Sequence, residues 1–302
     1  MKEKALKPAT VVMLLLLTLI WGLTLPVAKY ALQAFPPLLL GGLRFLLAGG
    51  IFLAISLKRW HEIRSQSRVD RKILLAYTLM LVIQIIFLFF GVENTSANRS
   101  TILFNTSPFW VLFLAIFFLP GERLTPFKWV GTSLAFVGLL VLFAGRRPAE
   151  AGGTLFGDLL VLAAAFTWGI RIVLLKHFQP GTSVVTIQLW QFLLGGAILT
   201  GLGFGVESVN DIHLSPGIVA AFLFLAVVSN AIAFALWTYL VTQGAATRMA
   251  PFLFLSPVFG VLASAVLLGE PVSTPLVISL VSVGCGIFVV NYSGRFGLPK
   301  HP

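Results

Sequence analysis

The chain has 302 residues, of which 58% are hydrophobic and only 10% are charged. Because a soluble domain carries about 25% charged residues, this composition excludes a water-soluble globular protein. The net charge of +11 does not indicate nucleic-acid binding, because six of the 21 Lys and Arg residues crowd into the short segment 58–72. A basic loop between two apolar runs is typical of the cytoplasmic side of a membrane protein, where it also meets anionic lipid headgroups.

Ten apolar runs, separated mostly by short loops, follow one another along the chain. A transmembrane helix needs about 20 mostly apolar residues, so we predict an all-α membrane protein with ten transmembrane helices. The predicted helices are residues 10–31, 38–57, 72–92, 97–119, 126–145, 154–178, 184–205, 216–241, 245–268 and 274–292. The first run is longer than the apolar part of a signal peptide, and we interpret it as a retained first helix.

The distribution of Lys and Arg predicts the orientation. With the N-terminus inside, 15 of the 21 Lys and Arg residues fall in cytoplasmic segments, three fall outside, and three lie within helices. By the positive-inside rule, both termini are expected in the cytoplasm. We therefore expect a multi-pass protein of the bacterial inner membrane.

Two stretches, 103–126 and 253–275, repeat one pattern of Ser-Pro, an apolar run, Gly-Glu and Thr-Pro at an offset of 148 or 149 residues. Trp21-Gly22 likewise matches Trp168-Gly169 at an offset of 147. A long match at a nearly constant offset indicates an internal duplication. We predict a first five-helix repeat at 10–145, a linker at 146–153 and a second five-helix repeat at 154–292.

An odd number of helices per repeat makes the second repeat enter the membrane from the opposite face. The repeats are therefore predicted to be inverted, related by an axis in the membrane plane, with Glu122 inside and Glu270 outside. Carriers of this kind bind their substrate between the repeats near the midplane, and broken helices at matching positions point to the site. The two Ser-Pro steps are such positions.

Polar, aromatic and proline side chains away from the helix ends are the candidate cavity residues. An arginine at the bilayer centre costs about 2.5–3.5 kcal/mol, so Arg44 and Arg171 are expected to face a cavity or a partner. The alternatives are snorkelling for the cations and helix–helix hydrogen bonds for the uncharged groups. The predicted set is Trp21, Thr24, Arg44, Gln84, Asn105, Pro108, Trp168, Arg171, Gln188, Asn230, Trp237 and Pro257.

Several chemistries have no support in the sequence. None of the ten Asp and Glu residues lies in the middle of a predicted helix, which argues against proton-coupled cation export and favours facilitated diffusion, exchange or another coupling. No phosphate-binding glycine loop, metal-ligand spacing or disulfide framework occurs, and Cys285 is interpreted as a packing residue. We expect neither a metal nor a cofactor.

The arrangement resembles the EamA branch of the drug/metabolite transporter superfamily over nearly the whole chain. The resemblance rests on Trp21-Gly22, Arg44, the Gly157-Asp158 opening of the second half and the two Ser-Pro to Gly-Glu blocks. It implies a cavity walled by helices 1, 3, 4, 6, 8 and 9, with helices 5 and 10 at the periphery. It also implies export of amino acids or related metabolites, as in aromatic-amino-acid exporters of the YddG type. One departure is Gln191, which stands at the position matching Arg44.

The expected function is therefore a secondary transporter, not an enzyme, that exports small metabolites, with aromatic or other neutral amino acids first. The alternative is a related transporter of nucleosides, sugars, lipid-linked intermediates or hydrophobic drugs. The expected partners are a small-molecule substrate and membrane lipids, without nucleic acid, in a monomer or homodimer.

Overall fold

The computed structural model describes residues 8–57, 71–118, 126–144, 154–175, 184–208, 212–236 and 255–292. Within these ranges the chain is almost entirely helical and contains no strand. The predicted linker 146–153 and Trp237 lie outside them. The helices are α1 (Pro8–Ala31), α2 (Pro37–Leu57), α4 (Arg71–Asn94), α5 (Ala97–Phe104), α6 (Ser107–Phe118), α7 (Pro126–Ala144), α8 (Leu155–Leu175), α9 (Val184–Val206), α10 (Pro216–Leu223), η1 (Phe224–Ile232), α13 (Leu255–Leu268) and α14 (Thr274–Tyr292).

These elements form the ten predicted membrane helices. Six described spans are long and apolar enough to cross a bilayer, namely α1, α2, α4, α8, α9 and the continuous span Pro216–Leu236 made by α10 and η1. The apolar helices α7, α13 and α14 supply three more, and α5 with α6 supplies the tenth. The prediction of an all-α membrane protein with ten helices is therefore confirmed.

The fourth predicted helix, 97–119, is broken in the structure. Asn105 caps the C-terminus of α5, and the Thr106 hydroxyl donates a hydrogen bond of 2.6 Å to the Leu103 carbonyl. The helix restarts as α6 at Ser107, immediately before Pro108, which has no N–H to continue the ladder. In the second repeat α13 begins at Leu255, one residue before Ser256-Pro257, and residues 237–254 lie outside the described ranges.

The eighth predicted helix also departs from a regular α-helix. Its middle, η1, is a nine-residue π-helix that contains Ser229 and Asn230. Stretches of π-helix are rare and occur frequently at functional sites. The hydrophobic pattern of this apolar run does not predict the change in helical pitch.

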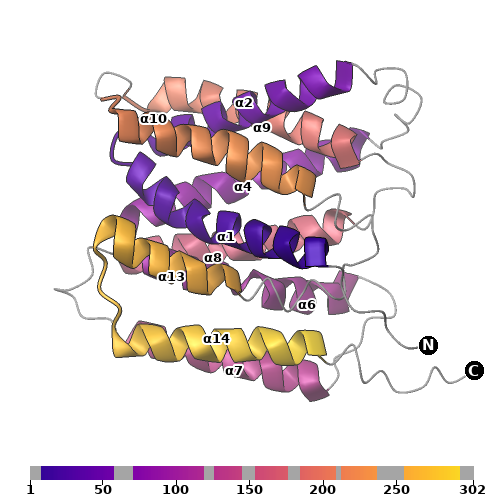
Figure 1. Ribbon diagram of the computed structural model, residues 1–302. Coiled ribbons are helices and arrows are strands. Elements are labelled where there is room, and N and C mark those ends of the chain that lie inside the picture. Colours follow the sequence, from indigo (N-terminus) through magenta and orange to yellow (C-terminus); the bar gives the residue numbers. More distant parts are fainter. Residues whose placement is uncertain are drawn as a thin grey trace, which may run out of the picture.

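Helices from opposite repeats pair side by side (Figure 1). The extensive contacts join α2 with α9, α4 with α8, α1 with α13 and α7 with α14. The pair α7 and α14 lies along the lower edge of the bundle in Figure 1, where Gly138 packs closely on Ser279 and Ser282. The resemblance implied this peripheral place for helices 5 and 10. The bundle thus consists of cross-repeat pairs.

Equivalent residues of the two repeats make equivalent contacts across the α2–α9 pair. A Cβ added to Gly49 would lie 3.1 Å from the Leu193 nitrogen, and one added to Gly196 would lie 2.9 Å from the Leu46 nitrogen. Gly49 and Gly196, like Leu46 and Leu193, are 147 residues apart. The two glycines therefore permit the same close approach in both directions, as an inverted pseudo-symmetry requires.

The Trp-Gly motifs show the same relation on the other side of the bundle. Gly22 of α1 lies against Phe259 and Gly260 of α13, whereas Gly169 of α8 lies against Trp110 and Val111 of α6. Each Trp-Gly step thus packs on the helix that follows Ser-Pro in the opposite repeat. These reciprocal contacts confirm the two inverted five-helix repeats.

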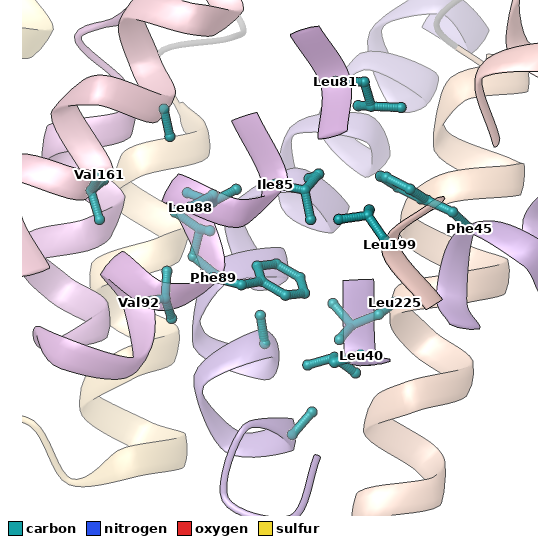
Figure 2. Close-up of a cluster of buried hydrophobic side chains, with 14 of the residues drawn as sticks. Leu40, Phe45, Leu81, Ile85, Leu88, Phe89, Val92, Val161, Leu199 and Leu225 are labelled. Atoms are coloured by element: carbon teal, nitrogen blue, oxygen red, sulfur yellow. The ribbon is translucent and has the colours of Figure 1, made fainter. Parts of the chain in front are cut away.

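Apolar side chains from both repeats fill the space around these pairs (Figure 2). Phe45 of α2 and Phe192 of α9, again 147 residues apart, have ring centroids 5.1 Å from each other. Phe89 of α4 and Leu225 of η1 are fully buried in the same cluster. This core surrounds the few buried polar groups described next.

Candidate functional site

Arg171 of α8 joins the two repeats through hydrogen bonds to neutral groups. Its Nη1 donates to Gln84 Oε1 of α4 and its Nη2 donates to Gln191 Oε1 of α9, both at 2.7 Å. All three side chains are buried, and only 3% of Arg171 is exposed. Arg171 lies four residues before the last residue of α8, whereas Gln84 lies near the middle of α4. The group therefore sits between the centre of the bundle and the end at which α8 finishes.

Aromatic rings flank this guanidinium. The Cζ atom of Arg171 lies 4.5 Å from the ring centroid of Tyr77 and 5.4 Å from that of Trp168. Trp168 in turn meets Phe104 edge-on, with centroids 6.2 Å apart. Phe104 is the last residue of α5, so this contact connects the helix break with the arginine. Cation–π contacts of this kind stabilise a buried guanidinium without neutralising its charge.

Arg44 of α2 is a second buried arginine in apolar surroundings. Its Cζ atom lies 4.5 Å from the ring centroid of Phe89 and 4.8 Å from that of Phe45. Only 4% of the side chain is exposed, and its Nε finds no hydrogen-bond partner in the described part of the chain. The structure does not bring Arg44 into hydrogen-bond contact with Gln191, its counterpart in the second repeat.

A second polar group lies between α1 and the π-helix η1. The hydroxyls of Thr24 and Ser229 lie 2.8 Å apart, and Thr24 also donates to the Ile20 carbonyl. Asn230 is 4% exposed, and its Nδ2 has no partner among the described residues. Trp21, one turn before Thr24, meets Phe234 edge-on at 6.2 Å between centroids. Two predicted site residues, Thr24 of α1 and Asn230 of η1, thus lie on the two elements of this pair.

The remaining predicted residues are more dispersed. Gln188 of α9 is buried, and its Oε1 has no partner within the described ranges. Asn105 donates to the Thr101 carbonyl at 2.7 Å, inside its own helix. Pro108 occupies the second position of α6, and Pro257 is buried in the first turn of α13. Trp237 lies outside the described residues, and the binding role of the whole set stays a prediction.

The predicted cavity set omitted two residues of the central group. Gln191 was noted for its difference from Arg44, yet it is the acceptor that ties Arg171 to α9 within the second repeat. Tyr77 was not considered, although it lies seven residues before Gln84 and therefore on the same face of α4. Helical spacing from Gln84 is the sequence signal that identifies it.

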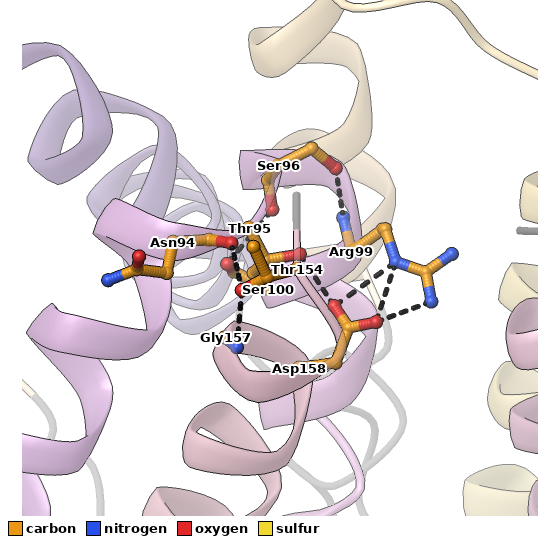
Figure 3. Close-up of polar contacts among 8 residues, drawn as sticks. All are labelled: Asn94, Thr95, Ser96, Arg99, Ser100, Thr154, Gly157 and Asp158. Carbon is orange, nitrogen blue, oxygen red and sulfur yellow. Dashed lines mark hydrogen bonds and ion pairs between the residues drawn. The ribbon is translucent and has the colours of Figure 1, made fainter. Parts of the chain in front are cut away.

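At the opposite end of the bundle, a buried ion pair joins the two repeats (Figure 3). Arg99 of α5 donates from Nε and Nη2 to the carboxylate of Asp158 in α8, with the shortest distance 2.6 Å. The Thr95 hydroxyl donates to the same carboxylate at 2.5 Å. Asp158 is completely buried. The sequence placed Asp158 in the first turn of its helix but did not predict its cation.

Two further carboxylates of the second repeat bind helix N-termini of the first repeat at this end. Glu270 accepts from the Ala97 and Asn98 nitrogens at 2.7 and 2.8 Å, and so caps α5. Glu207 accepts from the Leu38 and Leu39 nitrogens at 2.7 and 3.0 Å, and so caps α2. A carboxylate satisfies the free N–H groups and the positive dipole end of a helix. We call the contacts of Asp158, Glu207 and Glu270 the three carboxylate clamps.

The same end carries a lysine cap and an open pocket. Lys29, at the end of α1, donates to the Val92 and Glu93 carbonyls of α4 at 2.7 and 2.6 Å. A pocket of about 350 Å³ lies beside it, lined among others by Gln33, Glu93 and Glu207. This pocket contains none of the predicted cavity residues.

Reciprocal repeats, a broken helix and buried polar groups between the repeats define a membrane carrier. The model of the EamA-like transporter family matches residues 8–144 and again 155–292, and the chain belongs to this family.

Known relatives agree with this assignment. A Salmonella typhimurium protein named "Probable amino-acid metabolite efflux pump" is 30% identical over 93% of this chain and 94% of its own length. A Bacillus subtilis protein named "Uncharacterized transporter YvbV" is 28% identical over 96% of this chain and 93% of its own length. A crystal structure with 21% sequence identity superposes with a TM-score of 0.70, covering 96% of this chain and 99% of that one, and so shares the fold.

Proposed function

We propose that this multi-pass transporter exports small metabolites, amino acids and their derivatives first among them, across a bacterial inner membrane. The proposed mechanism is alternating access, in which the two repeats rock about a site that lies between them. The name of the Salmonella relative supports the substrate class. The transporter needs no resident cofactor or metal in this scheme, and its partners are the substrate and the surrounding lipid.

The observation that carries the proposal is the cross-repeat bonding of Arg171. Arg171 lies in the second repeat, and its hydrogen bonds reach Gln84 across the boundary in the first repeat and Gln191 in its own repeat. A group that both repeats contact changes its surroundings when they move relative to each other. A substrate bound there would therefore respond to the change from one open side to the other, as alternating access requires.

The three carboxylate clamps support the direction. The distribution of Lys and Arg predicts that the end with Asp158, Glu207 and Glu270 faces outward and that both chain termini are cytoplasmic. All three clamps join one repeat to the other, so they hold the proposed outer end closed. A transporter that rests closed to the outside is suited to load from the cytoplasm, as an exporter must.

One copy of the chain supplies every residue of the central group, so a monomer suffices for transport and a homodimer is compatible with it. A transporter of nucleosides, sugars, lipid-linked intermediates or drugs would have the same fold. The fold is therefore common to these alternatives, and a direct transport test distinguishes their substrate classes.

Purified protein in liposomes loaded with a panel of labelled metabolites provides this test. We expect saturable efflux of amino acids or their derivatives, and none of nucleosides or sugars, with and without a pH gradient. Efflux confined to another substrate class would replace the proposed substrate, and the absence of flux for the whole panel would overturn the proposal.

A further inference from the structure

Two arginines of this protein use the same edge of the guanidinium in different ways. Arg99 presents its Nε and Nη2 to the carboxylate of Asp158, which accepts from both nitrogens. In Arg171 the Nη2 donates to the amide oxygen of Gln191, while the buried Nε has no partner among the described residues. The Nε–Nη2 edge that binds a carboxylate in Arg99 therefore makes only one hydrogen bond in Arg171, and the acceptor of that bond is neutral.

No carboxylate of the described residues pairs with Arg171. The four described acids are Glu93, Asp158, Glu207 and Glu270, and all lie at the ends of their helices on the clamped side of the bundle. The segment 237–254, outside the described ranges, contains neither Asp nor Glu in its sequence. Within the described part of the chain, hydrogen bonds and aromatic rings hold the guanidinium, and no acid compensates its charge.

We propose that Arg171 is the binding group for a substrate carboxylate and that the transported species is a monoanion without a free ammonium group. This inference rests on the proposed export function and narrows its substrate class. A substrate carboxylate would accept hydrogen bonds from both Nε and Nη2 of Arg171, as Asp158 does from Arg99. It would thereby replace the amide oxygen of Gln191 as the acceptor for Nη2. The rings of Tyr77, Trp168 and Phe104 suit an apolar or aromatic remainder of the substrate.

The surroundings of Arg171 disfavour the zwitterionic amino acid. An ammonium group brought beside the guanidinium would meet a like charge and would find no described carboxylate to replace its lost hydration. N-acylated amino acids and 2-oxo acids carry the carboxylate and the side chain without this cost. The broken helix adds a weaker effect in the same direction, because α6 begins next to Phe104 and helix N-termini favour anions.

An anionic substrate also supplies the energy coupling. The empty protein returns to its starting state after each cycle, so the net charge that crosses the membrane is the charge of the substrate. An inside-negative potential of about 100 mV would drive a monovalent anion outward to a concentration ratio of roughly fiftyfold. Export on this basis requires no buried proton carrier.

Phenylalanine, N-acetylphenylalanine and phenylalanine amide share the same side chain and differ in whether they carry a carboxylate, an ammonium group or both. They therefore test separately the need for a carboxylate and the cost of an ammonium group. Efflux from proteoliposomes is measured with a potassium diffusion potential of either sign. We expect N-acetylphenylalanine to leave at least about tenfold faster than the other two and to leave faster when the inside is negative. Preferred efflux of phenylalanine, or efflux of N-acetylphenylalanine that ignores the potential, would overturn the inference and leave the export function intact.

Gln191→Glu tests the role of Arg171 without removing it. The new carboxylate would occupy the guanidinium edge as Asp158 does in Arg99, so we expect at least a tenfold loss of N-acetylphenylalanine efflux with an unchanged or higher melting temperature. Unchanged efflux would show that Arg171 only braces the helices. Arg71→Gln, at an exposed arginine that begins α4, is the matched charge control and should transport normally.

Discussion

The clamped end and the central group treat buried arginine in opposite ways. Arg99 is neutralised by Asp158 inside the protein, with a shortest distance of 2.6 Å, and the pair joins the two repeats. Arg171 also joins the repeats, but through the neutral oxygen of Gln84, and it donates its second hydrogen bond to the neutral oxygen of Gln191 in its own repeat. The first arrangement is complete without a ligand, whereas in the second no acid among the described residues compensates the positive charge. The difference is the basis for the proposal that Arg171 binds a substrate, whereas the contact of Arg99 with Asp158 is structural.

Pseudo-symmetry makes the comparison sharper. The offset of 147 places Val11 of the first repeat at the position of Asp158, whereas Glu122 corresponds to Glu270 at an offset of 148. Asp158 therefore has no acidic counterpart near the start of α1, whereas Glu270 has one in Glu122. The two ends of an inverted-repeat bundle need not be held closed equally strongly, and here the sequence favours closure of the end that carries the three carboxylate clamps.

The largest predicted effect is on the ion pair. Asp158→Asn leaves Arg99 buried without its counterion, which costs about 3–5 kcal/mol and should lower the melting temperature in detergent strongly. In a Cys285→Ser background, a cysteine replacing the buried Thr101 should also react at least tenfold faster with an impermeant reagent applied from outside. Glu93→Gln removes an exposed acid at the same end and is the control. A wild-type melting temperature and labelling rate in Asp158→Asn would refute the clamp.

The next effect concerns the axis between the repeats. Gly49→Ala places a Cβ 3.1 Å from the Leu193 nitrogen and 2.7 Å from its Cδ2, which should cost about 1–3 kcal/mol. The neighbouring Gly50→Ala meets nothing within 4 Å and should be neutral or slightly stabilising. Thermal unfolding of both variants measures the difference. Equal melting temperatures would contradict the close packing of α2 on α9.

A smaller effect is expected at the helix caps. Glu270→Gln keeps one acceptor for the Ala97 and Asn98 nitrogens but removes the charge at the N-terminus of α5. The clamped end, proposed to be the outer one, should lose roughly 0.5–2 kcal/mol of closing free energy, visible as a modest rise in the labelling of Thr101→Cys. Adding Glu207→Gln should raise the rate further, because its clamp lies on a different helix. No rise in the double variant would show that these carboxylates do not hold the end closed.

The smallest effect concerns the contact between α1 and the π-helix. Thr24→Val and Ser229→Ala should each lower stability slightly, and a double-mutant cycle should give a coupling of about 0.6 kcal/mol, as for other hydrogen bonds between membrane helices. A coupling near zero would place the two hydroxyls out of contact in the membrane.

The sequence predicted the repeats because duplication leaves a record in the spacing of Trp-Gly, Ser-Pro and Gly-Glu. The sequence also identified Arg171 and Gln84 as candidate site residues, because individual polar residues are easily recognised within apolar helices. It did not predict that Arg171 bonds Gln84 and Gln191, which are 87 and 20 residues away in the chain. Such partners depend on the rotation of each helix about its axis, and helices that are apolar all round record no preferred face.

The clamps were missed for a related reason. Asp158, Glu207 and Glu270 were assigned to helix ends or loops, which is where they lie, but their partners are backbone groups and a distant arginine. Free N–H groups exist at every helix start, so the sequence cannot show which one a carboxylate will cap. The π-helix η1 was missed because a change of helical pitch leaves the apolar pattern of a membrane span intact.

The most direct test of the carboxylate site is a calorimetric titration of the purified protein with N-acetylphenylalanine. The account predicts saturable binding to the wild-type protein and to Glu93→Gln, and at least tenfold weaker binding to Gln191→Glu. Equal affinity of wild type and Gln191→Glu, or binding of phenylalanine amide as tight as that of N-acetylphenylalanine, would contradict it.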